Sequence, residues 1–148
     1  MIAEDEASVP AFLRDLPEFQ ADVRNYQNSV RRADDTLGAI IAALAASGME
    51  EEALVIFLSD HGMPFPFGKS SAYDNGLRIP LVIRWPGRIA SDTVERRLVS
   101  AVDLMPTILD PAVVPMPSGR DYTGRSLLRG GTLERDFVFG SFDENVCV

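Results

Sequence analysis

The feature that most constrains the fold is a run of six consecutive apolar residues, Ala53 to Leu58. The run shows no alternation of apolar and polar positions, which is typical of a strand that is apolar on both faces. Such a strand belongs in the middle of a sheet that is covered on both sides, as in α/β proteins. Polar residues follow at once, because Asp60 and His61 come directly after Ser59. The run therefore predicts a buried strand with a polar site at its carboxyl end, where open α/β sheets bind their ligands.

The residues before this run predict one long helix. Apolar side chains recur there at three- and four-residue steps and form a single stripe. They are Tyr26, Val30, Ala33, Leu37, Ile40, Ile41 and Leu44. Pro17 is suited to the first turn of this helix, and Ser47-Gly48 supplies its stop. Residues 1–16 are expected to be irregular.

The residues after the run predict a continuing α/β order without internal repeats. The expected elements are a strand at 80–85 that ends at the Pro86-Gly87 turn, a helix at 103–109 with Asp103 as cap, an extended connection at 110–131 and a last strand at 136–142. This order is helix, strand, loop, strand, helix, strand. It contains too few strands for a complete large sheet.

Composition narrows the class of protein. A chain of 148 residues is long enough for one compact domain, which we expect to span 1–148. The net charge of -8 argues against nucleic-acid binding, which requires clustered Lys and Arg. The single cysteine, Cys147, excludes an internal disulfide and a Cys-rich zinc site. No membrane span is expected, and the acidic start is the opposite of a signal peptide.

The only histidine and the only lysine of the chain lie within one nine-residue stretch, 61–69. The carboxylate of Asp60 and the imidazole of His61 are metal donors, although two donors are too few for a complete site. The ammonium of Lys69 suits an oxyanion such as sulfate or phosphate. A structural interpretation stays open, in which Asp60 caps a turn, His61 bonds a carbonyl and Lys69 is solvated. The apolar residues 64–67 either fill a gap in the core or form the wall of a pocket.

These residues resemble the second half of a sulfatase, in the alkaline-phosphatase-like superfamily. The resemblance covers about 20–142 and rests on seven segments in the family's order. They are Leu54–Gly62, Gly68-Lys69, Tyr73-Asp74, Leu77–Pro80, Trp85–Gly87, Val102–Asp110 and Thr123–Leu128. The stretches Met63–Pro66 and Pro115–Ser118 are similar to the sulfamidase (heparan N-sulfatase) branch. The resemblance implies a partial sulfatase sheet with flanking helices.

The resemblance also implies roles for three residues. Asp60 and His61 occupy two ligand positions of the family's divalent metal ion, usually calcium. Lys69 occupies the position of a catalytic lysine that contacts the substrate sulfate. The family's nucleophile is a formylglycine made within a C-x-P-S-R type motif, and no such motif occurs in these 148 residues. We therefore expect a sulfuric ester or sulfamate hydrolase portion that is inactive on its own.

Two alternatives to this function remain. Phosphodiesterases and phosphonate hydrolases of the same superfamily share the metal-binding pair, and a non-catalytic structural or interaction module is also compatible with the sequence. A sulfated small molecule or glycan is the expected partner of a completed site. A homo-oligomer or a complementing N-terminal half is expected to cover the apolar edges of a partial sheet. The family is often periplasmic, secreted or lysosomal, but the sequence does not indicate the location of this chain.

Overall fold

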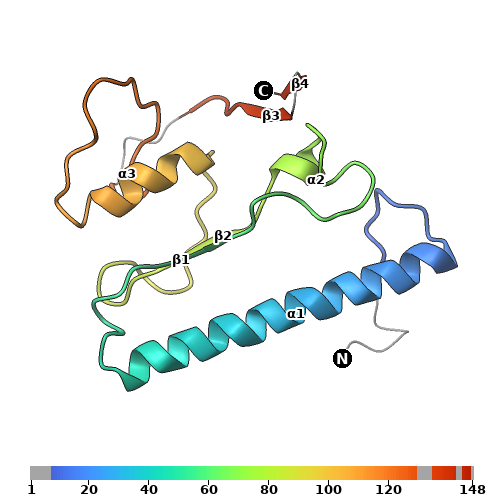
Figure 1. Cartoon of the computed structure of the whole chain (residues 1–148), viewed down its shortest axis with the longest axis horizontal. Helices are drawn as coiled ribbons and strands as arrows, with labels where there is room; N and C mark the ends of the chain where they lie inside the picture. Colours follow the sequence, from blue (N-terminus) through green and yellow to red (C-terminus); the bar gives the residue numbers. More distant parts are fainter. Residues whose placement is uncertain (1–7, 130–134, 143–144, 148) are drawn as a thin grey trace. The chain divides into compact units, whose positions relative to one another are not determined.

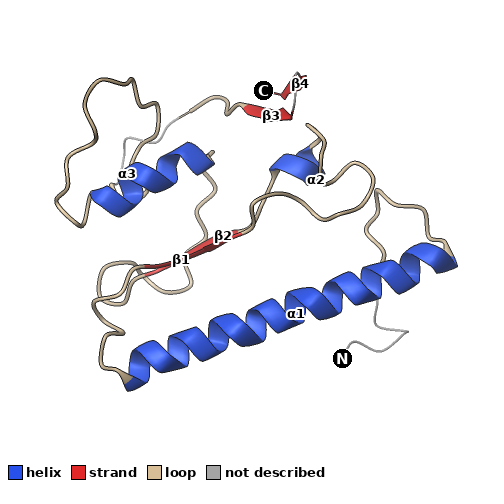
Figure 2. Ribbon diagram, viewed as in Figure 1, coloured by secondary structure: helices blue, strands red, loops and turns tan. Residues whose placement is uncertain are grey.

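The structure is a computed structural model that describes residues 8–129, 135–142 and 145–147. It consists of two compact units, Met1–Asp92 and Thr93–Val148 (Figure 1). The first unit contains a long helix and a pair of strands, and the second contains short helices and a strand pair (Figure 2). Helices and small antiparallel sheets are thus both present, as a partial α/β fold requires. The expectation of one domain over 1–148 stays a prediction.

The long helix α1 spans Pro17–Ala46 and confirms the prediction from the apolar stripe. Pro17 lies in the first turn, where its missing N–H costs no helical hydrogen bond. Gly48 ends the helix with a φ of 73°. The N–H of Gly48 donates to the carbonyl of Ala45, and that of Met49 donates to Leu44. This pair of bonds is the Schellman arrangement, which satisfies carbonyls left free at a helix end.

The strand expected at the apolar run is present as β1, Val55–Leu58, but its surroundings differ from the prediction. It pairs antiparallel with β2, Leu81–Arg84, in a two-stranded sheet. Its first three residues are half-buried and Leu58 is exposed, so the expectation of burial on both faces was wrong for this chain. An apolar run indicates that a strand can be covered on both faces. It does not indicate which part of the polypeptide covers it.

A short helix, α2 at Asp74–Leu77, occurs in the chain after β1 and before β2. It was not predicted. Four residues are too few for a hydrophobic period to be recognisable. The segment 8–16, which leads into α1, contains no helix or strand, as expected, and residues 1–7 lie outside the described residues. The buried side of α1 in this unit is marked by Val23, which is 1 % exposed.

The second unit contains the 3₁₀ turn η2 at Ala101–Asp103 and the helix α3 at Leu104–Leu109. Asp103 is the N-cap residue of α3, as predicted, but its side chain makes no cap bond there. It closes instead a capping box with Ser100, the N-cap of the 3₁₀ turn. The last strand is shorter than expected, because β3 covers only Gly140–Phe142 and pairs with β4, Asn145–Cys147. Between 110 and 129 the chain is irregular, as predicted.

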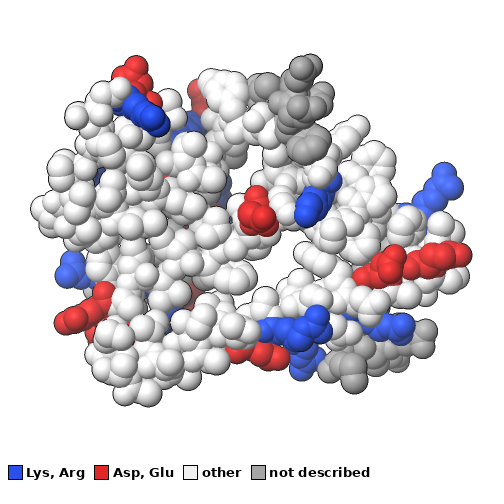
Figure 3. Space-filling view, viewed as in Figure 1, with Lys and Arg blue, Asp and Glu red and all other residues white. Residues whose placement is uncertain are grey.

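Charged side chains of both signs are exposed to solvent. On the face drawn in Figure 3, acidic and basic side chains are interspersed among wide uncharged areas. The expectation that nucleic acid is not a partner stays a prediction. None of the helices in the described part of the chain combines the length and the apolar character that a bilayer span requires.

Candidate functional site

The segment that follows β1 is held by its own backbone. The N–H of Gly62 donates to the carbonyl of Gly76 at 2.9 Å. The carbonyl of Met63 accepts two bonds of 2.8 Å, from the N–H groups of Phe65 and Lys69. Lys69 is therefore fixed, through its main chain, to a residue only two positions after His61. We call residues 59–69 the site loop.

Glycines make this tight backbone packing feasible. A Cβ atom on Gly62 would lie 1.7 Å from the carbonyl oxygen of Asn75, and one on Gly76 would lie 2.4 Å from the carbonyl oxygen of Gly68. No side chain fits at such distances, so both positions require glycine. The sequence identified Gly62 and Gly68 within the motif, but the need for Gly76 follows only from the folded loop.

Asp60 and His61 point toward one another at the end of β1. Their side chains approach to 3.5 Å between His61 Nε2 and Asp60 Oδ2. His61 Nδ1 lies 2.8 Å from the carbonyl oxygen of Gly62. A carbonyl oxygen only accepts, so this bond places a proton on Nδ1, and Nε2 is the ring nitrogen nearest the carboxylate. The hydroxyl of Ser59 steadies this arrangement by donating to the carbonyl of His61 at 2.6 Å.

The Asp60–His61 pair passes a chemical test for part of a metal site. A metal-binding histidine typically donates its other ring N–H to a carbonyl or carboxylate, as Nδ1 does here. The two donor atoms lie 3.5 Å apart, and the carboxylate oxygen suits Ca²⁺ better than the imidazole nitrogen does. Within the described residues, no group of three or more His, Cys, Asp and Glu side chains could hold a metal ion. Asp60 and His61 thus offer two donor atoms, which are too few for a complete site.

Lys69 lies at the other end of the site loop and is exposed. Among the described residues its ammonium makes no ion pair. The preceding Phe67 and the following Ser70 both have positive φ values, 64° and 61°. Left-handed conformations cost energy for residues other than glycine. The surrounding hydrogen bonds must therefore hold the turn that carries Lys69 in this conformation.

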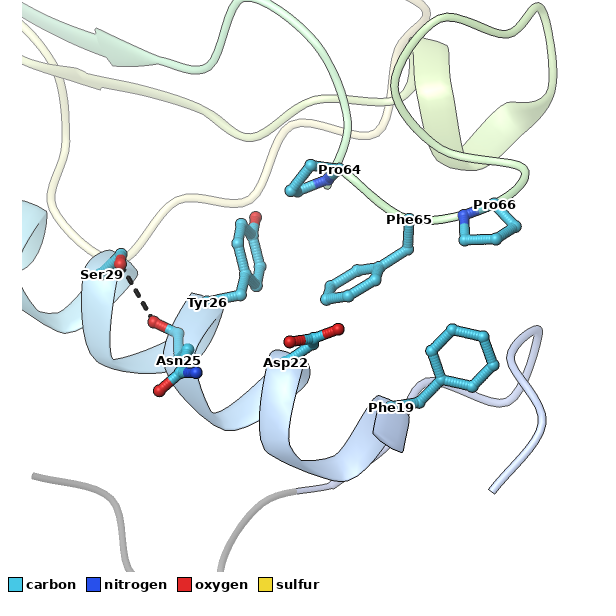
Figure 4. Close-up of a pocket in the computed structure, with 8 residues that line it drawn as sticks. All are labelled: Phe19, Asp22, Asn25, Tyr26, Ser29, Pro64, Phe65 and Pro66. Carbon is cyan, nitrogen blue, oxygen red and sulfur yellow. Dashed lines mark hydrogen bonds between the residues drawn. The ribbon is translucent and has the colours of Figure 1, made fainter. Parts of the chain in front are cut away.

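The apolar part of the site loop packs on α1 and also forms the wall of a groove (Figure 4). Phe65 points toward the helix and meets Tyr26 edge-to-face, with ring centroids 5.8 Å apart. The groove has a volume of about 500 Å³ and is lined by Phe19, Asp22, Asn25, Tyr26, Ser29, Pro64, Phe65 and Pro66. The stretch thus packs against α1 through Phe65 and bounds an open concavity, while Pro64, Pro66 and Phe67 are exposed and do not fill a core.

The two arginines near β2 differ in their contacts. Arg84 forms an ion pair with Glu50. Arg78 is bonded to Asp74 through the main chain, because its backbone N–H donates to the carbonyl of Asp74 at 2.8 Å. The structure thus assigns a structural role to the Arg84 side chain.

The other two motifs of the resemblance meet in the second unit. The buried carboxylate of Asp103 accepts bonds from the backbone N–H groups of Ser100 and Arg125, at 2.9 and 2.8 Å. The guanidinium of Arg135 binds both of its oxygens, at 2.7 and 2.6 Å. Thr107, also buried, accepts the N–H of Leu127 at 2.9 Å. Segments 102–110 and 123–128 are thus joined by side chain to backbone bonds.

Asp110, like Asp103, is bonded to an arginine and to a second donor, but it lies nearer to solvent. It accepts a bond from the hydroxyl of Ser126 at 2.8 Å and forms an ion pair with Arg129. The bonds from Arg129 and then Ser126 hold the pKa of Asp110 below its usual value. Burial of Asp103 acts to raise its pKa, but bonds from Arg135, Arg125 and Ser100 outweigh burial and lower the pKa. Both carboxylates serve the fold.

Arg135 was missed by the sequence reasoning. It lies 32 residues after Asp103, and no spacing rule connects the two. A buried aspartate requires a cationic partner, because an unpaired charge in the interior is costly. That requirement predicts that a partner exists without indicating which of the arginines fills the role.

Comparison with known proteins identifies the family. Residues 3–113 match the family model described as Sulfatase. The chain is 37 % identical over 128 residues to human N-sulphoglucosamine sulphohydrolase, an alignment that covers 81 % of the chain and 26 % of that protein. It is 34 % identical over 131 residues to mouse (Mus musculus) N-acetylgalactosamine-6-sulfatase, covering 77 % of the chain and 25 % of the relative.

A third relative aligns with fewer residues of the chain and at a lower identity. The chain is 32 % identical over 102 residues to the ulvan-active sulfatase of Formosa agariphila, covering 69 % of the chain and 17 % of that protein. The chain thus spans about a quarter or less of the length of these curated relatives. Because the family model matches well over half of its residues, the chain belongs to the sulfatase family.

Proposed function

We propose that this chain supplies part of the active site of a sulfuric ester or sulfamate hydrolase. The observation that carries the proposal is the Asp60–His61 pair, whose two donor atoms lie 3.5 Å apart at the end of β1. Family membership supports a hydrolase of this class. The likeness of the chain to N-sulphoglucosamine sulphohydrolase supports sulfamates as substrates beside esters.

In this proposal Asp60 and His61 hold a divalent cation, with calcium as the family's usual ion. When bound, the cation polarises the sulfuryl group. The chain's own contribution is orientation: Gly62 fixes the imidazole through Nδ1, and Ser59 fixes the backbone at His61. Lys69 brings a compact positive charge that binds sulfate and stabilises the charge that develops on the leaving atom.

No C-x-P-S-R segment is present in these 148 residues, and within the described residues no third His, Cys, Asp or Glu side chain completes a metal-binding group with the pair. We therefore propose that a polypeptide limited to this sequence does not turn over sulfate esters. An assay of the purified chain with an aryl sulfate and calcium tests this point. Sustained turnover above the uncatalysed rate would contradict it.

A chimera tests the positive part of the proposal. The 128-residue segment of human N-sulphoglucosamine sulphohydrolase that aligns with this chain is replaced by the chain's own residues. We expect hydrolysis of a sulfamate substrate that requires a divalent cation and falls at least about 100-fold in Lys69→Met. Arg96→Met, an exposed cation outside the site loop, is the matched control and should retain the rate.

The same chimera separates sulfate from phosphate chemistry. Sulfamate, aryl sulfate and aryl phosphate diester substrates are compared at equal concentration. Faster hydrolysis of the phosphate diester would favour the phosphodiesterase alternative. A folded chimera that hydrolyses none of the three would contradict the proposed role of the site loop.

A further inference from the structure

Two exposed aromatic residues flank Lys69 in the chain. Phe67 and Tyr73 meet edge-to-face, with ring centroids 5.3 Å apart and ring planes at 84°. Their contact closes residues 67–73 into a small loop, and Lys69 belongs to that loop. Phe67 is 52 % exposed and Tyr73 is 60 % exposed. The two perpendicular rings therefore form an apolar corner that faces solvent, which we call the aromatic corner.

The backbone at the aromatic corner is held by polar bonds. The hydroxyl of Ser71 donates to the carbonyl of Gly68 at 2.6 Å, and the N–H of Lys69 donates to the carbonyl of Met63 at 2.8 Å. Phe67 has a φ of 64°, which costs energy for an aromatic residue and none for glycine. Stability alone does not explain an exposed aromatic ring in a strained conformation, and strain of this kind gathers at ligand sites.

The charge within the loop indicates the kind of ligand. Lys69 is the only lysine of the chain, and it is exposed. A ligand that suits both the rings and the ammonium has an apolar face and an anionic group. A sulfated sugar has both, because the C–H bonds on one face of a pyranose ring pack against the negative face of an aromatic ring, and its sulfate pairs with the ammonium.

The second unit contains a pair of rings that serves as a comparison. Phe137 and Phe139 also meet edge-to-face, with ring centroids 5.2 Å apart, and both are exposed. The residue next to Phe137 is Asp136, whose carboxylate repels anions. This second pair resembles the aromatic corner in geometry but has an acidic neighbour in place of a lysine.

We propose that Phe67 and Tyr73 determine specificity by packing on the pyranose ring of the sulfated substrate whose sulfate Lys69 binds. The aromatic corner thereby selects a sugar over a flat aryl group. This inference rests on the proposed function, because it takes its ligand from the substrates of that function.

Binding to the full chain tests the aromatic corner directly. The probe is the methyl glycoside of N-sulphoglucosamine, titrated into the chain and followed by the NMR signals of the aromatic rings. We expect the signals of Phe67 and Tyr73 to shift until they saturate, while those of Phe137 and Phe139 stay unchanged. Equal shifts of both pairs, or no shift of the first, would overturn the proposal.

Variants separate binding from folding. Phe67→Gly removes a ring where glycine adopts the backbone freely, so the thermal midpoint should stay near that of the wild type while the affinity falls at least about fivefold. Tyr73→Ala should weaken binding similarly, whereas Tyr73→Phe keeps the ring and should retain it. Phe139→Ala is the matched control. Wild-type affinity in both Phe67→Gly and Tyr73→Ala would overturn the proposal.

Two further ligands test the selection. The methyl glycoside of N-acetylglucosamine has the sugar ring without the sulfate and should bind at least about fivefold more weakly, because Lys69 has no anion to pair with. Phenyl sulfate has the sulfate without a sugar and should also bind more weakly. Tighter binding of phenyl sulfate than of the sulfated sugar would overturn the assignment to a sugar.

The outcome for the proposed function is measured separately, because binding at the aromatic corner needs neither a nucleophile nor a cation. Saturable ring shifts together with an inactive chimera would support the corner and contradict the proposed function. In an active chimera, Phe67→Gly should raise KM for the sulfamate sugar at least about fivefold and change kcat little. An active chimera with an unchanged KM would support the function and contradict the corner.

Discussion

Two aspartates, both within motifs of the sulfatase resemblance, have opposite environments. The side chain of Asp60 is 85 % exposed and approaches only His61 among the described residues. The side chain of Asp103 is fully buried and bonded to Arg135 and to two backbone N–H groups. The site loop is fixed largely by backbone bonds and leaves the side chains of Asp60 and Lys69 available. The second unit is fixed by the polar side chains themselves.

This difference separates functional from structural motif residues. A side chain that holds the fold must be satisfied within the fold, because a buried polar group without a partner is costly. A side chain that binds a ligand must keep bonding capacity unused. By this criterion Asp60 and Lys69 keep the bonding capacity that the proposed site requires, whereas Asp103, Thr107 and Asp110 belong to the architecture.

The largest effect is expected at Asp103. Asp103→Asn removes the charge that pairs with Arg135 in a site where both side chains are largely shielded. Breaking a buried pair costs about 3 kcal/mol or more, so the second unit should lose roughly a hundredfold in its unfolding equilibrium. Amide exchange at Arg125 and Leu127, whose N–H groups enter this network, measures the loss. A change below about 1 kcal/mol would mean that the network is not structural.

The second largest effect on stability is expected at Gly62, which serves the site loop through its backbone and not through a side chain. Gly62→Ala forces a Cβ atom against the carbonyl of Asn75 and should destabilise the first unit by about 2 kcal/mol. Gly38→Ala is the control, because nothing lies within 4 Å of its added Cβ and alanine favours the helix by up to about 1 kcal/mol. Denaturant unfolding followed by the fluorescence of Trp85 compares the two. Equal stability of both variants would contradict the packing of this loop.

Acid should act on the second unit through Asp103. Its native pKa is lowered, so the carboxylate contributes stability that is present above the ordinary value of about 3.9. That stability is lost as the pH falls from about 3.9 through the lower native pKa. We expect the protection of the Arg125 amide to decrease over this range in the wild type. In Asp103→Asn the decrease should be smaller, with the part that Asp110 contributes remaining, and an unchanged decrease would assign the titration to another group.

The smallest effect is expected at an exposed ion pair in the same unit. Arg97 lowers the pKa of Glu95 to about 2 through a side-chain bond, and both groups are exposed to solvent screening. Despite the pKa shift, Glu95→Gln should leave thermal stability indistinguishable from the wild type. A loss comparable to that of Asp103→Asn would remove the distinction between buried and exposed pairs.

Much of the local structure could be predicted from the sequence. The stripe of α1, its glycine stop, both strands of the first unit and α3 all follow from patterns within a few residues. The partners of the strands could not be predicted, because an apolar run does not specify what covers it. Arg135 could not be paired with Asp103 for the same reason, since long-range contacts leave no local period in the sequence.

The candidate site was predicted in part. The residue types and spacing indicated Asp60, His61 and Lys69, and the structure brings the first two together. The sequence left open whether His61 bonds a carbonyl or serves a metal. The structure shows that the carbonyl bond uses Nδ1 and leaves Nε2 available, so the two interpretations are compatible. The use of Nδ1 for the carbonyl bond depends on where the backbone places Gly62, which the sequence pattern does not indicate.

The most direct test of the account compares Asp60→Asn with the wild type in the chimeric N-sulphoglucosamine sulphohydrolase. Asp60 is exposed, so the substitution should leave the thermal midpoint unchanged. Sulfamate hydrolysis should fall at least about 100-fold, because the negative charge that the carboxylate offers to the cation is lost. Hydrolysis within about threefold of the wild type, at an unchanged thermal midpoint, would contradict the assignment of Asp60 to the site.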